Sequence, residues 1–239
     1  AKGFVGSQGV IGYSTVERLS GMSSGLIRSA NLTKAIRYLK SATEDRAYRA
    51  TMYNMGYTKS LFFANKGFTH LRLVLGEDDL LIQKLSNQDN TAVIINPFAT
   101  TIARAPLTLK EARSQEKYYG YTARYYPRKA RFDAFFELFT RALFFCNWLL
   151  IIAFSVWDLT QSGISLSTAS IAAWGTLSVG LLLGLLRELS MTSAIKLISK
   201  RLGEKKILGW MILYDKIAPV SKAWISISRR IKPPHGLWQ

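Results

Sequence analysis

Two long stretches without a charged residue constrain the fold of this chain more than any other feature. Residues 142–157 consist mainly of Leu, Ile, Phe and Trp, and residues 166–186 are also uncharged. As a helix, the first stretch would be about 24 Å long, and the second is long enough to cross a bilayer. We therefore predict a hairpin of two transmembrane helices, at about 142–158 and 166–186. The alternative is a pair of core helices in a soluble protein.

Basic residues flank these stretches asymmetrically. Lys and Arg are concentrated in residues 124–141 and 187–206, whereas residues 158–165 contain neither. Because cytoplasmic flanks of membrane helices are enriched in Lys and Arg, both termini are predicted to be cytoplasmic. After the second stretch, the pattern predicts basic amphipathic helices lying in the membrane interface, with a break at Pro219.

The strong positive charge narrows the choice of partner. The 239 residues include 32 Lys+Arg and 15 Asp+Glu, which gives a net charge of +17. A membrane-tethered nucleic-acid binder is one interpretation of such a charge. Since the excess is greatest in the half that holds the apolar stretches, we expect membrane lipid as the partner and no nucleic acid. The single cysteine, Cys146, excludes an intrachain disulfide.

The best candidate for chemistry is the acidic run Glu77-Asp78-Asp79, which follows Gly76 and is flanked by apolar residues. Neighbouring carboxylates repel one another and lose hydration beside apolar groups. The run is either a solvated turn or a catalytic edge in which one carboxylate acts as a general base.

The surrounding motifs favour the second interpretation. Residues 54–62 read Asn-Met-Gly-Tyr-Thr-Lys-Ser-Leu-Phe, residues 66–68 read Lys-Gly-Phe, and residues 76–80 read Gly-Glu-Asp-Asp-Leu. Their order and spacing resemble the C-terminal portion of family 2 glycosyltransferases, especially membrane-attached bacterial ones. In that family an N-x-A-Y-x-K-S-L-F loop and a K-G-F turn precede a G-[DE]-D-D-L motif.

The resemblance implies an α/β fold, the later half of a GT-A type domain, with the nucleotide-binding half preceding residue 1. On this basis residues 1–127 are a partial GT-A catalytic domain on the acceptor side, residues 128–190 the transmembrane hairpin and residues 191–239 a basic amphipathic interfacial tail. A divalent cation, Mg²⁺ or Mn²⁺, is expected from the missing half and its Asp-x-Asp pair, with no metal ligand among the residues present.

The resemblance also implies a reaction. An inverting glycosyltransferase moves a sugar from a nucleotide-diphosphate donor to a hydroxyl of a glycan or lipid-linked acceptor, here at the cytoplasmic face of a bacterial inner membrane. Asp78 would be the general base, with Glu77 and Asp79 shaping its field. Asn54 would line the acceptor or donor pocket, and Gln115 would lie on a helix that closes over the diphosphate.

The closing helix departs from the family pattern. At residues 115–119 the family usually has Q-K-x-R-[HW]. Gln115 fits, but Lys117 and Tyr118 follow it without the expected Arg, which is the better bidentate ligand for a diphosphate. Lys117 or Arg124 would then supply the positive charge. Alternatively, the tyrosines around Tyr118 form an aromatic belt beside the membrane.

Local patterns predict the remaining elements. Residues 1–24 are rich in Gly and Ser and are predicted to be a surface loop, with one possible strand at 10–13. The predicted helices are 26–39, 59–64 with an exit through a left-handed Gly67, and 78–86, and the predicted strands are 91–96 and 100–105. A non-enzymatic two-span membrane subunit that docks on a partner remains the alternative function.

Overall fold

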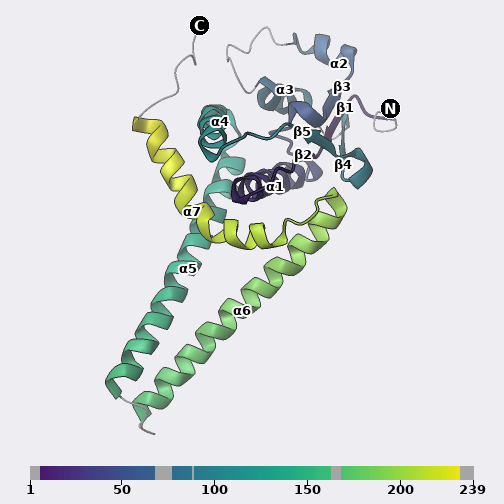
Figure 1. Ribbon diagram of the computed structural model, residues 1–239. Coiled ribbons are helices and arrows are strands. Elements are labelled where there is room, and N and C mark those ends of the chain that lie inside the picture. The colour runs from purple at the N-terminus through teal and green to yellow at the C-terminus, as the bar shows by residue number, and fades with distance from the viewer. Residues whose placement is uncertain (1–5, 68–76, 88, 163–167, 232–239) are drawn as a thin grey trace.

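The computed structural model describes residues 6–67, 77–87, 89–162 and 168–231 (Figure 1). Within these residues 72% are helical and 8% belong to strands. The α-helices are α1 (Met22–Thr43), α2 (Lys59–Ala64), α3 (Glu77–Leu85), α4 (Leu109–Thr122), α5 (Arg128–Ser162), α6 (Thr168–Leu202) and α7 (Leu208–Ile231), and the short 3₁₀ helices are η2 (Met52–Asn54), η3 (Pro97–Ala99) and η4 (Ala123–Tyr125).

The strands form two small sheets. In the first, β1 (Gly9–Gly12) pairs antiparallel with β3 (Met55–Tyr57) and parallel with β4 (Thr91–Ile94). In the second, β2 (Ser14–Val16) pairs parallel with β5 (Thr101–Ala103). Residues 1–24 were predicted to be a surface loop with one strand at 10–13. That strand is confirmed within one residue as β1, which is buried throughout, whereas β2 was not predicted.

The predicted fold class is wrong. The described chain is mostly helical with only small sheets, and does not form an α/β GT-A domain followed by a two-helix transmembrane hairpin. Among the described residues, one helix is long and apolar enough to cross a membrane, over Arg128–Gln161, and only 6% of its apolar window is buried. By contrast, α6 carries charges from Arg187 onward and buries Ile195 and Leu202 in the core.

Helices α5 and α6 lie side by side and extend away from the rest of the molecule (Figure 1). Small residues on α6 permit their close approach, since a Cβ on Gly184 would lie 2.7 Å from Nε1 of Trp148. The Trp148 indole N–H donates to the carbonyl of Gly180 at 2.8 Å, and the hydroxyls of Ser155 and Thr176 are 2.9 Å apart. Hydrogen bonds and close packing thus join α5 to α6, whereas the outer surface of the pair exposes many large apolar side chains.

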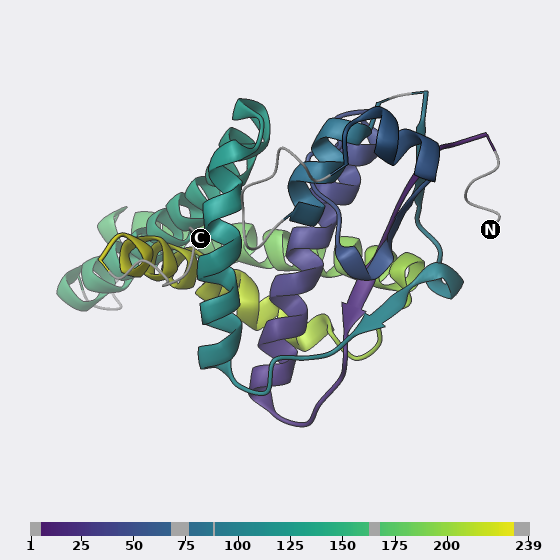
Figure 2. The ribbon, with the colours of Figure 1, turned by 90° about the horizontal axis from the view of Figure 1, so that it is seen from above.

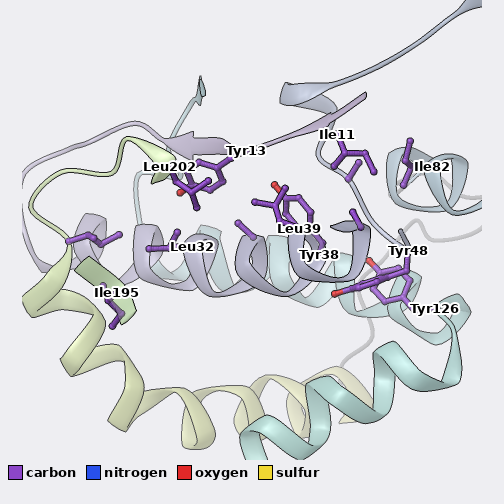
Figure 3. Packing of buried hydrophobic residues seen from close by; sticks show 14 of the residues in the cluster. Ile11, Tyr13, Leu32, Tyr38, Leu39, Tyr48, Ile82, Tyr126, Ile195 and Leu202 are labelled. Atoms are coloured by element: carbon purple, nitrogen blue, oxygen red, sulfur yellow. The ribbon is translucent and has the colours of Figure 1, made fainter. Parts of the chain in front are cut away.

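Helix α1 is the centre of the core. It lies between the strands on one side and α4 on the other, as Figure 2 shows from above. Its residues Leu32, Ala35 and Leu39 are at most 4% exposed. They pack with residues from β1, from the loop that follows α1 and from α6. Figure 3 labels the following members of this cluster: Ile11, Tyr13, Leu32, Tyr38, Leu39, Tyr48, Ile82, Tyr126, Ile195 and Leu202. The helix predicted at 26–39 is therefore confirmed, and it is longer at both ends.

Helix α7 crosses beneath α1 and bends about midway (Figure 1). It contains Pro219, so the predicted break there is wrong. An internal proline costs a helix about 3 kcal/mol because it removes a backbone donor and clashes with the preceding turn. Burial of Met211, Tyr214, Ala218 and Ile225 along one face offsets that cost and keeps the helix continuous.

Candidate functional site

The first family-like motif packs against α3, the helix that begins with the third motif. Leu61 from α2 packs with Leu81 and Leu85 from α3, and all three are at most 7% exposed. Tyr57 and Phe62 lie against this cluster with their rings stacked at 5.4 Å. We call these five side chains the motif cluster. It joins residues 54–62 to the helix that begins with the acidic run.

The second motif packs onto the first. Gly67 has a φ of 51°, which a residue with a Cβ adopts only with strain, and a Cβ there would lie 2.6 Å from Cζ of Phe62. The Lys84 ammonium donates to the carbonyl of Asn65 at 3.2 Å. The prediction of a helical turn at 59–64 with a left-handed glycine exit is confirmed.

The acidic run lies at the N-terminus of α3, as its backbone shows. Glu77 is the first helical residue, followed by Asp78 and Asp79, so the helix predicted at 78–86 is confirmed within one residue. Carboxylates are favourable at this end of a helix because of its dipole. The side chains of all three lie outside the described part of the structure, and their catalytic roles stay a prediction.

Asn54 holds strands together. Its Nδ2 donates to the carbonyls of Tyr13 and Ala99. It packs so closely on β1 that a Cβ on Gly12 would lie 2.7 Å from its side chain. The described contacts of Asn54 are therefore structural, and the structure does not place it among the residues that line the cavity described next.

A cavity of about 600 Å³ lies between α1, α4, α7 and the ends of β2 and β5. Helix α4 forms one wall and begins at Thr108, whose hydroxyl accepts from the amide of Glu111 at 3.1 Å. The Glu111 carboxylate in turn accepts from the amide of Leu107, the residue before the cap. The predicted Gln115 lines the cavity, whereas Lys117 does not. The side chain of Tyr118 lies outside the described part.

The lining is unusually basic. Among the residues that the structure describes, the cavity is lined by one acidic residue, Glu116, and by five basic residues: Lys34, Arg49, Arg104, Arg113 and Lys222. The Arg49 guanidinium also lies over the Tyr119 ring at 5.2 Å from its centroid. This excess of positive charge is the most distinctive electrostatic feature of the cavity.

Glu116 is shared by two lysines. The Lys34 ammonium lies 2.7 Å from one carboxylate oxygen, and the Lys222 ammonium contacts the other. Burial opposes ionisation of Glu116, but the two ammonium groups outweigh it and hold the pKa of this carboxyl well below its ordinary 4.5. Burial also lowers the pKa of Lys34, although Glu116 opposes that shift. Two lysine side chains therefore share one carboxylate within the cavity wall.

These lysines were not among the residues predicted from the sequence. Lys34 is 82 positions from Glu116, and Lys222 is 106 positions away. No local pattern reports a contact over such a separation. The available signal was an acid on the predicted closing helix with Arg113 and Lys117 nearby, and it names no partner.

A metal site is not formed by the described side chains, among which no three His, Cys, Asp or Glu residues gather to hold an ion. The divalent cation implied by the family resemblance therefore finds no set of ligands there. Comparisons of the chain with family models, with curated proteins and with solved structures give no match.

Proposed function

We propose that this chain is part of a glycosyltransferase that moves a sugar from a nucleotide-diphosphate donor to an acceptor hydroxyl next to a membrane. The observation that carries the proposal is the motif cluster. The first two motifs pack together through Phe62 and Gly67, and Leu61 of the first packs on Leu81 of α3, the helix that begins with the third motif. A chance likeness between separate short motifs would not require their segments to lie next to one another.

The acidic run is held on this cluster. Leu81 is fully buried and lies two residues after Asp79, so the first turn of α3 is fixed in position by the packing beneath it. Asp78 in that turn is the proposed general base, which removes the proton of the acceptor hydroxyl as it attacks the anomeric carbon. Glu77 and Asp79 would keep the local field negative.

The neighbouring helices support a location at a membrane. Helix α5 is apolar enough to cross one and buries little of that surface against the chain. Helix α7 exposes Val220, Trp224 and Ile231 along a helix with basic residues. Such a helix suits the interface between water and lipid.

The test is sugar transfer by the gene product that contains these 239 residues. Asp78→Asn should retain donor binding and lower turnover by about two to four orders of magnitude, the usual share of a general base. Asp89→Asn is the matched control, because Asp89 is exposed and follows α3. Normal transfer by variants at Glu77, Asp78 and Asp79 would remove the catalytic proposal and favour an interaction subunit.

A further inference from the structure

We propose that the cavity between α1, α4 and α7 binds a phosphate-bearing lipid, with its phosphate at the basic wall and its hydrocarbon chain at an apolar mouth formed by α7. Insofar as this lipid would be the sugar acceptor or its carrier, the inference rests on the proposed function. The binding itself can be measured without any sugar transfer.

The charge of the wall selects the head group. Glu116 is already shared by Lys34 and Lys222, so it cannot neutralise Arg104 and Arg113, which line the same cavity and are exposed. A carboxylate ligand would bring one negative charge, whereas a phosphate monoester brings up to two and accepts hydrogen bonds at several oxygens. The guanidinium group of an arginine can donate two parallel hydrogen bonds to two oxygens of one phosphate. A phosphate therefore fits this wall best.

Part of the cavity lining is apolar and reaches the outer surface of the molecule. Leu26 and Ile27 of α1 line it together with Ile217, Val220 and Trp224 of α7. Val220 is 74% exposed and Trp224 is 61% exposed, so the apolar lining continues onto the outer surface of α7. A nucleotide or a free sugar phosphate would leave this border in water. An amphiphile with a hydrocarbon chain covers it and gains the apolar contact.

Contacts of α7 with α5 and α6 place the apolar mouth of the cavity near the ends of the uncharged segments of those two helices. Asp215 of α7 is 3% exposed and accepts from Arg187 of α6 at 2.5 Å, and it lies 3.0 Å from Nε of Arg141 of α5. The uncharged part of α5 starts directly after Arg141, and that of α6 ends directly before Arg187. In Figure 1, α7 crosses the pair at this end. The Asp215 contacts therefore hold the cavity beside the boundary of the apolar surface.

The first experiment titrates dodecyl phosphate into the 239-residue chain in a neutral detergent and follows binding by calorimetry. We expect saturable binding to one site. The double variant Arg104→Ala/Arg113→Ala should weaken it about tenfold or more, since two charge-assisted contacts are lost. Both residues are exposed, so folding is not at risk. Absence of saturable binding by the unaltered chain would overturn the proposal.

Lys110→Ala is the matched control for the basic wall. Lys110 is exposed on α4, the helix that carries Arg113, but does not line the cavity. It should change the dodecyl phosphate affinity less than about twofold, as expected for a screened surface charge. An equal loss in Lys110→Ala and in the double variant would show attraction to general surface charge and would overturn the site.

The apolar mouth has its own test. Val220→Ser should weaken dodecyl phosphate binding several-fold, whereas Ile231→Ser should not, because Ile231 is similarly exposed on α7 but lies outside the cavity lining. Inorganic phosphate and uridine diphosphate should each bind at least about a hundredfold more weakly than dodecyl phosphate, since neither buries a chain. Equal affinity for inorganic phosphate, or tighter binding of the nucleotide, would overturn a lipid ligand.

The two proposals can fail separately. Asp78→Asn should lower transfer by about two to four orders of magnitude and leave dodecyl phosphate binding unchanged, because the motif cluster does not line the cavity. Transfer without dodecyl phosphate binding would overturn the lipid site alone. Binding without transfer in any gene product would leave the lipid site and remove the glycosyltransferase.

Discussion

Glu204 is a buried carboxylate and Glu116 a partly buried one; both contact cations, yet their surroundings differ. Glu204, in the connection between α6 and α7, accepts from the hydroxyls of Tyr13 and Thr15 and pairs with Arg28, and its side chain is 1% exposed. Its donors come from the strand segment and from α1, which are far away in sequence. This carboxylate joins the α6–α7 connection to the core.

Glu116 joins helices as well, but at a surface that stays open. Its partners Lys34 and Lys222 are 27% and 20% exposed, and all three line the cavity. The Glu204 cluster balances one cation with one anion and completes it with neutral hydroxyls. The Glu116 cluster leaves one cation in excess. A balanced, enclosed pair stabilises a fold, whereas an unbalanced one beside a cavity can also attract an anion.

The largest expected effect is a loss in the free energy of unfolding when the Glu204 cluster is broken. Glu204→Ala leaves Arg28 buried and charged without its carboxylate, and the Nε of Arg28 already has no partner. We expect a loss of about 3–5 kcal/mol in the free energy of unfolding, measured by denaturant titration in detergent. Glu44→Ala, which removes an exposed pair with Arg46, should cost less than about 1 kcal/mol. Similar losses in both variants would contradict the structural role of Glu204.

At the Glu116 cluster we expect a smaller loss in the free energy of unfolding, together with tighter binding of dodecyl phosphate. Glu116→Gln keeps the shape of the side chain but leaves Lys34 and Lys222 without a counter-ion, at a cost of about 1–3 kcal/mol because water can reach them through the cavity. The added net charge should strengthen dodecyl phosphate binding. Glu111→Gln on the same helix is the control and should do neither. Weaker phosphate binding in Glu116→Gln would contradict the contrast between the clusters.

Local elements were largely predictable from the sequence. The spacing of apolar residues identified α1, and Lys66-Gly67 marked the end of α2 because a left-handed turn favours glycine. The short strands β4 and β5 were also found, though each is shorter than predicted. These features depend on neighbours within a few positions, and such signals are present in the sequence itself.

The long-range arrangement was not predictable. The strand expected at 10–13 was found as β1, but its pairing with 55–57 and 91–94, and the strand β2, could not be read from the sequence. Pro219 normally ends a helix, but packing of α7 against α1 overrides it. The resemblance to a GT-A domain led to the wrong fold class because it was carried by short motifs and not by the strands between them. The shared carboxylate of Glu116 likewise depends on three helices meeting.

The finest test of the comparison uses pH. The folded-state pKa of Glu116 lies below its ordinary 4.5, so ionised Glu116 contributes stability above pH 4.5. This contribution is lost progressively as the pH falls from 4.5 toward the folded-state pKa. Between pH 5 and pH 4 the unfolded chain binds this proton while the folded chain does not. Linkage then gives a loss of about 0.7 kcal/mol for this one group.

Other carboxylates titrate over the same range, so the measured quantity is a difference between two proteins. The free energy of unfolding of the unaltered chain should fall about 0.7 kcal/mol further than that of Glu116→Gln between pH 5 and pH 4, because Gln does not titrate. Parallel pH profiles would mean that Glu116 is not held ionised by Lys34 and Lys222, and the cavity would then lose the charge arrangement on which its proposed ligand depends.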